Sequence, residues 1–271
     1  MAQSFETPAS VKSGLGLRIA SALVMTPVAV GAVWAGSPWF GILLFVFSAA
    51  MLWEWLRMCV PDRAMVLAGV ASAGLAVAMY LLSVSPQLTV FVPVLVAALV
   101  VVVASGKQRP LVMAGALYIP VAALAAQWLR AWHPDGLLLI MWLFFVVWAT
   151  DTGAYAFGRA IGGPKLAPQF SPKKTWAGLI GGMLCAALIG ALIVNFSGGK
   201  AIWAISLASA ALAIIAQIGD LAESGLKRRF GVKDSSNLIP GHGGFLDRAD
   251  GMLSVFPVAF VIIYFFDLAL R

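Results

Sequence analysis

The sequence predicts an all-α, polytopic integral membrane protein with about nine transmembrane helices. Hydrophobic residues make up 62% of the 271 residues and charged residues only 11%, where a soluble domain carries about 45–50% and about 25%. The apolar residues form runs long enough to cross a bilayer, which takes roughly 20 helical residues. The basic residues gather in alternate segments between these runs. These observations exclude a soluble globule, a disordered chain and a nucleic-acid-binding module.

Nine apolar runs have the length expected of a transmembrane helix. Pro93 and Pro120 interrupt the fourth and fifth runs, an interruption that membrane helices tolerate better than soluble ones do. The runs divide the chain into a tail at 1–16, N-terminal transmembrane helices at 17–150, and a C-terminal catalytic region at 151–271 with two polar loops. The expected spans are Leu17–Ala35, Trp39–Leu56, Ala64–Leu82, Leu88–Ala104, Leu111–Leu129, Gly136–Tyr155, Ala177–Phe196, Ala201–Glu223 and Gly251–Leu270.

The distribution of basic residues tests this number of spans. With the N-terminus inside, cytoplasmic segments hold 15 of the 18 lysines and arginines, and only Arg130, Lys200 and Arg271 lie outside. One missed helix would invert every later segment, so the positive-inside rule supports nine spans and a cytoplasmic tail. The same rule accounts for the net charge of +7 without a nucleic-acid partner. The tail has no Ala-x-Ala cleavage pattern, so we expect no removed signal peptide.

Polar residues that could carry chemistry collect near two long cytoplasmic loops, Ala156–Trp176 and Ser224–Asp250. Acidic side chains are rare inside membrane helices and are functional candidates there. In the last 121 residues, six of the eleven acidic residues lie at the cytoplasmic ends of predicted spans or in the second loop: Asp151, Asp220, Glu223, Asp234, Asp247 and Asp250.

Helical spacing would place several of these residues on shared faces. Residues three, four and seven apart lie on one side of a helix, and this spacing holds for Asp220, Glu223, Ser224 and Lys227. Asp247 and Asp250 are three apart and would point the same way in a helical turn. Carboxylates that converge from two helices can hold a hard cation such as Mg²⁺. Alternatively, they pair with nearby lysines and arginines in an interfacial charge network, and the spacing leaves both interpretations open.

The basic residues and glycines nearby suit a phosphate. Lysine and arginine supply donors for anions, and the two loops contain Lys174, Lys227, Arg228 and Lys233. The alternative is the positive-inside signal itself, or attraction to anionic lipid headgroups. Glycines in the run 241–244 would let backbone N–H groups approach a phosphate, although such a run is also typical of a flexible loop. The sequence contains no Walker motif and no dinucleotide fingerprint.

The second loop resembles the signature of the phosphatidate cytidylyltransferases, also called CDP-diacylglycerol synthases. The resemblance covers Ser224–Asp250 without a gap, in the blocks SGLKR at 224–228, KD at 233–234 and PGHGGFLDRAD at 240–250, with Ala249 as a conservative departure. The segments 151–155, 171–178 and 219–224 are also similar, with Ala177 in place of a frequent glutamate. In the first 150 residues only scattered positions match, such as Glu54 and Trp55.

The resemblance implies that CTP and phosphatidate give CDP-diacylglycerol and pyrophosphate. It implies Mg²⁺, and K⁺ beside it, at a cytoplasmic site in the cell membrane, and a homodimer. The implied metal ligands are Asp220, Asp247 and Asp250, which are also implied as catalytic residues with Lys227 and Arg248. The implied substrate-binding residues are Ser171, Lys174, Lys227, Arg228, Lys233, His242, Gly243 and Gly244.

Three alternatives remain at this stage. The first is a CTP-dependent enzyme that acts on a different membrane lipid, since the same loops would serve and apolar residues would choose the lipid. The second is an ion or solute transporter, which predicts acids deep within spans and inverted repeats. The third is a structural membrane scaffold, which leaves the polar block 224–250 unexplained.

Overall fold

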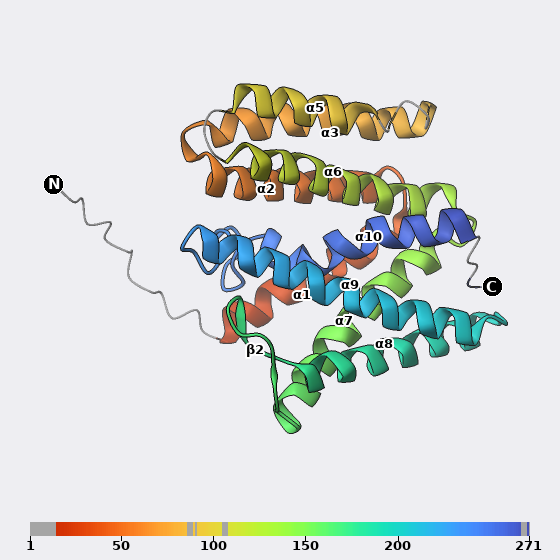
Figure 1. Ribbon diagram of the computed structural model, residues 1–271. Coiled ribbons are helices and arrows are strands. Elements are labelled where there is room, and N and C mark those ends of the chain that lie inside the picture. The colour runs from red at the N-terminus through yellow and green to blue at the C-terminus, as the bar shows by residue number, and fades with distance from the viewer. Residues whose placement is uncertain (1–14, 86–88, 90, 105–107, 267–269, 271) are drawn as a thin grey trace.

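The computed structural model describes residues 15–85, 89, 91–104, 108–266 and 270, and side chains from residue 23 onward. Its helices run between two ends of one bundle, left and right in Figure 1. Most of the predicted tail at 1–16 and parts of the fourth and last predicted spans lie outside the described residues. The described residues are overwhelmingly helical, which confirms the all-α prediction in outline.

α2, α3, α5 and α6 form the upper part of the bundle in Figure 1, whereas most of α1 lies below them. α2 packs against α3 and α6, while α5 packs against α3 and α6. Trp55 ties α2 to the start of α6, because its Nε1 donates to Leu111 O at 2.8 Å. The elements are α1 (Leu15–Ala35), α2 (Trp39–Cys59), the short 3₁₀ helix η1 (Pro61–Arg63), α3 (Ala64–Val84), α5 (Phe91–Val103) and α6 (Arg109–Trp132).

The C-terminal elements form the lower part, and α10 contacts both halves through α9 and α6. α7 and α8 approach each other closely because α8 presents glycines. A Cβ at Gly178 would lie 2.8 Å from Ala154 O, and one at Gly182 would lie 2.8 Å from Thr150 O. The elements are α7 (Gly136–Ala160), β1 (Lys165–Ala167), β2 (Ser171–Thr175), α8 (Trp176–Ser197), α9 (Ile202–Arg229) and α10 (Leu246–Phe266).

Seven of the nine predicted spans correspond to helices that are long and apolar enough to cross a membrane, among the residues the structure describes. The two shorter apolar helices are Leu23–Ala35, counted from the first described side chain, and Phe91–Val103. Large apolar side chains are widely exposed on the bundle surface, up to 88% at Trp203. A surface of this kind suits contact with lipid tails.

The structure differs from the predicted loops in two respects. The first loop contains an antiparallel hairpin in which Lys165 pairs with Thr175 and Ala167 with Ser171. In the second loop, the flanking helices reach further than hydropathy indicates. α9 continues to Arg229, since charged residues four apart support a helix by pairing. α10 starts at Leu246, where side-chain carboxylates accept the N–H groups that a helix start leaves free.

Candidate functional site

The polar residues singled out by the sequence meet at one end of the bundle. This end contains the C-terminal end of α7, the β1–β2 hairpin, the end of α9, the connection 230–245 and the start of α10, all toward the left in Figure 1. Because the helices extend into the predicted loop, Lys227 and Arg228 lie on the last turn of α9, and Asp247 and Asp250 lie on the first turns of α10.

The hairpin brings a cation to α9. Lys174 on β2 pairs with Asp220 at 2.5 Å between Nζ and Oδ2, and both side chains are mostly covered. The second oxygen of Asp220 accepts from Ser224 Oγ at 3.3 Å, one helical turn further along α9. Thr175 ends the strand and caps α8, accepting from Gly178 N at 3.1 Å. The hairpin is therefore anchored beside α8 with its lysine directed at the carboxylate.

Three carboxylates from three helices act on one another electrostatically. Asp250 is repelled by both Asp220 and Asp151, which come from α10, α9 and α7 respectively. Lys174 and Arg248 act on Asp151 with the opposite sign. Asp250 Oδ1 accepts from Gly251 N at 2.8 Å. Carboxylates that repel each other favour a cation or a donor-rich ligand between them.

A second cluster centres on Lys227. Its Nζ lies 2.9 Å from Glu223 Oε1 and 2.6 Å from Asp247 Oδ1, so it links α9 to α10. The side chains of Glu223 and Asp247 are each only 5% exposed. Two buried carboxylates that share one lysine make that lysine indispensable, because a charge left without a partner in such a position is strongly destabilising.

Asp247 also organises the connection before α10. Its Oδ2 accepts from Ser235 N and Ser235 Oγ, each at 2.9 Å, and from Gly244 N at 2.8 Å. Gly243 has a φ of +86°, a conformation that favours glycine, and a Cβ there would lie 2.9 Å from Asp247 Oδ2. The glycine run is thus folded around a carboxylate, and the Gly244 N–H group, one of those expected to approach a phosphate, donates to Asp247 here.

Glu54 on α2 is the residue that sequence analysis missed as part of the site. It is completely buried and its two oxygens accept four hydrogen bonds from the connection and the start of α10. The donors are Ser236 Oγ at 2.5 Å, Leu246 N at 2.7 Å, Phe245 N at 3.0 Å and Ser235 Oγ at 3.2 Å.

A signal for Glu54 was present in the sequence, because it is the only charged residue in the predicted span Trp39–Leu56. A lone acid in an apolar span is expensive unless donors surround it. The sequence alone could not say which donors these are, since they lie 181 to 192 residues away.

The remaining predicted residues lie around these clusters. Arg248 is exposed and its Nε donates to His242 O at 3.0 Å. Arg228 donates to Val232 O at 3.2 Å, and Lys233 is exposed on the connection. Ser171 begins β2, three residues before Lys174. The structure therefore joins Asp220 to Lys174 and Asp250, and Lys227 to Asp247. Lys227 also acts on Asp250, so the two clusters adjoin. Ser171, Arg228 and Lys233 lie outside both clusters.

A pocket of about 640 Å³ adjoins the acidic residues between α2, α6, α9 and α10. Its lining includes Asp250 and Glu223, together with Tyr118, Arg229 and apolar side chains. Pockets of about 300–1,000 Å³ with a few convergent polar groups are typical of small-molecule sites. The carboxylates therefore border a space that a substrate could enter.

The carboxylate oxygens of the site could hold Mg²⁺ only together with oxygen atoms from a bound substrate. Asp220 and Asp250 offer hard oxygen ligands, and Mg²⁺ is commonly held by one or two carboxylates plus substrate phosphates. Within the described ranges, no group of three acidic, histidine or cysteine side chains could hold a metal alone. Asp247 would first have to release Lys227 or its backbone donors, so its part as a metal ligand stays a prediction.

Several known proteins similar to this chain are named phosphatidate cytidylyltransferase. The model of the cytidylyltransferase family matches residues 16–266. A phosphatidate cytidylyltransferase of Brucella suis is 39% identical over 246 residues, which cover 89% of this chain and 90% of the relative. The protein of that name from Brucella abortus matches to the same extent. One from Staphylococcus haemolyticus is 47% identical over 134 residues, 49% of this chain and 52% of the relative.

Proposed function

The chain belongs to the cytidylyltransferase family, and we propose that it transfers the cytidylyl group of CTP to phosphatidate, giving CDP-diacylglycerol and pyrophosphate for phospholipid synthesis. The observation that carries the proposal is the meeting of Asp220 and Asp250 with Lys174 at the end of a membrane-spanning bundle. A lipid phosphate is held at the membrane surface by its tails, and a nucleotide arrives from water. Their reaction therefore needs charged groups where helices leave the membrane.

The reaction must bring together two anions. An oxygen of the lipid phosphate attacks the α-phosphorus of CTP, the bond from that phosphorus to the β-phosphate oxygen breaks, and pyrophosphate leaves. Phosphatidate is already ionised near neutral pH, so no strong general base is required. The chain's part is to position both phosphates and to balance their charge, as in other transfers at phosphorus.

The residues of the site divide this work in the proposal. Asp220 and Asp250 would hold a Mg²⁺ ion, which when bound would neutralise phosphate charge and stabilise the leaving pyrophosphate. Lys174 would pass from Asp220 to a phosphate as the substrates enter. Lys227 keeps Asp247 and Glu223 in place, and Arg228 and Lys233 would meet the triphosphate from the aqueous side.

Pyrophosphate release from the purified full-length protein in detergent, with Mg²⁺, CTP and phosphatidate, tests the proposal. Asp250→Asn should lower the rate at least about 100-fold, since it removes a proposed metal ligand. The control variant Asp62→Asn, which changes an exposed acid on η1, should retain the wild-type rate. Chelation should abolish the rate and Mg²⁺ restore it, and replacing K⁺ by Na⁺ tests the proposed K⁺. Turnover with a different lipid only, or none from folded protein, would overturn the assignment.

The protein is a multi-pass membrane protein, and we propose the cell membrane with nine spans and a cytoplasmic N-terminus and site. The distribution of basic residues supports this orientation.

We also propose a homodimer. The resemblance of Ser224–Asp250 to the family signature supports it. The mass of the protein in detergent, measured by light scattering, tests the dimer.

A further inference from the structure

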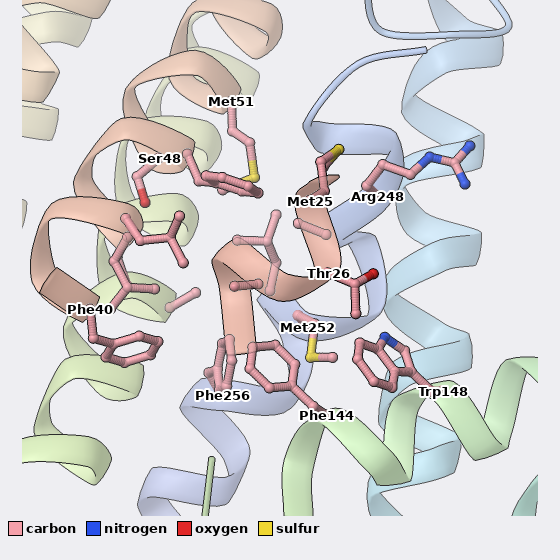
Figure 2. Close-up of a pocket in the computed structure, with 18 of the residues that line it drawn as sticks. Met25, Thr26, Phe40, Ser48, Met51, Phe144, Trp148, Arg248, Met252 and Phe256 are labelled. Carbon is pink, nitrogen blue, oxygen red and sulfur yellow. The ribbon is translucent and has the colours of Figure 1, made fainter. Parts of the chain in front are cut away.

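A second pocket lies within the membrane-spanning part of the bundle, apart from the acidic pocket. It has a volume of about 330 Å³ and is lined by residues of α1, α2, α6, α7 and α10 and by His242 of the connection before α10. Figure 2 shows its lining side chains, mostly aromatic rings, methionines and other apolar groups. Its walls are well formed, since Phe40, Met252 and Phe256 are each less than 10% exposed. A ligand of this pocket would have to be almost entirely apolar.

The pocket opens where α1 meets α7. Thr26 on α1 and Trp148 on α7 both line it and are both exposed, Trp148 by 43%. α1 and α7 are in contact, and both side chains lie on the same side of the pocket in Figure 2. Both residues belong to predicted spans, so this opening faces the bilayer and a lipid tail can enter from the side.

One end of the pocket carries a cation. The stem of Arg248 lines the pocket and its guanidinium extends away from the apolar cluster, as Figure 2 shows. Its Nε is held by His242 O, and its charge acts on Asp151. Its planar donor group suits a phosphate. A phosphate at Arg248 would lie between the apolar pocket and the carboxylates of the site.

We propose that this pocket holds one acyl chain of the phosphatidate substrate, with the lipid phosphate at Arg248. The inference rests on the proposed function and assigns its lipid subsite. Apart from Thr26, Ser48, His242 and Arg248, the lining is apolar, and an acyl chain needs no polar partner.

The pocket should select chains by fit. Phe256 lies eight residues beyond Arg248 on α10, about 12 Å deeper at 1.5 Å per residue, and like Phe40 it lines the pocket. A lipid tail leaves surroundings as apolar as the pocket, so burial gives little gain in affinity. Close packing against fixed aromatic walls instead rewards a chain of matching length and shape.

Labelling with a photoreactive lipid tests the subsite without turnover. The wild-type protein in phosphatidylcholine vesicles is irradiated with a phosphatidate that carries a diazirine near the end of one chain, and labelled peptides are identified by mass spectrometry. We expect labels on the α10 segment with Met252 and Phe256, competed by unlabelled phosphatidate and not by extra phosphatidylcholine. Equal competition by both lipids would overturn the proposal, because any membrane lipid would then fill the pocket.

The second test fills part of the pocket with a larger side chain. Ala29→Phe adds a ring to a residue that lines the pocket, whereas Val24→Phe adds one to an exposed position of the same helix outside the lining. Ala29→Phe should lower kcat/KM for dioleoyl phosphatidate by about tenfold, with little change for dihexanoyl phosphatidate or in the KM for CTP. Equal losses for both lipids, or equal effects of both variants, would overturn the subsite.

The two tests separate this inference from the proposed function. Specific labelling of α10 without CTP-dependent turnover of any lipid would sink the proposed reaction and leave the lipid site standing. Turnover with unaltered chain preference in Ala29→Phe would sink the lipid site and leave the reaction standing.

Discussion

The N-terminal helices α1 to α6 and the C-terminal elements α7 to α10 are similarly apolar, but they contribute to the polar site in different ways. The C-terminal part supplies both clusters of charges, in which Lys174 and Lys227 neutralise carboxylates from neighbouring elements. The N-terminal part supplies one acid, Glu54, whose partners are all hydroxyl and backbone donors. The C-terminal half thus supplies the charged groups of the site, while the N-terminal half holds the start of α10 in place through Glu54.

The largest expected effect comes from breaking the charge cluster of the C-terminal half. Lys227→Met leaves Glu223 and Asp247 as buried carboxylates without their cation, and breaking a buried pair in this way typically costs about 3–5 kcal/mol. We expect a fall in unfolding temperature and near-complete loss of activity. Lys233→Met, at an exposed position, should leave the unfolding temperature unchanged and raise only the KM for CTP. Similar melting curves for the two variants would contradict the cluster's structural role.

A smaller effect is expected from the anchor in the N-terminal half. Glu54→Gln keeps the shape but replaces an accepting oxygen with an amide that cannot accept, so at least one donor loses its partner. By analogy with residues that orient metal ligands, kcat should fall about 10- to 100-fold, with little change in the KM for CTP. Ser236→Ala removes one of the four donors to Glu54, and its kcat should lie between that of Glu54→Gln and that of the wild type. Unchanged kcat in Glu54→Gln would show that the anchor does not position the site.

The smallest effects are expected from two glycine-to-alanine variants that alter packing alone, one in each half of the protein. A Cβ at Gly219 would lie 2.8 Å from Ser254 Cβ and 2.9 Å from Asp250 O, and one at Gly74 would press on the side chain of Val96. Overpacking of this kind costs about 1–3 kcal/mol, so both alanine variants should melt earlier than wild type. Only Gly219→Ala should also lower kcat, because it displaces the turn that carries Asp250. Equal losses of kcat would mean that α3 and α5 also control the site.

The sequence by itself determined the class of the fold and the region of the site. Hydropathy runs indicate membrane helices because the bilayer fixes their length and composition, and seven of nine were found at the required length in the described residues. Spacing along α9 placed Asp220, Glu223 and Lys227 on one face, since helical periodicity is a local property. The hairpin 165–175 and the extra turns of α9 and α10 escaped prediction because polar segments carry no hydropathy signal.

Only the tertiary structure decided which charges became partners. Lys174 and Asp220 are 46 positions apart in the sequence, and Glu54 meets donors more than 180 positions away. No local pattern encodes these pairs, because they depend on how the helices pack side by side. The same packing turned Asp247 toward Lys227 and left Asp250 beside Asp220 and Asp151. Composition and periodicity thus set the elements of this protein, while long-range packing set the electrostatics of its site.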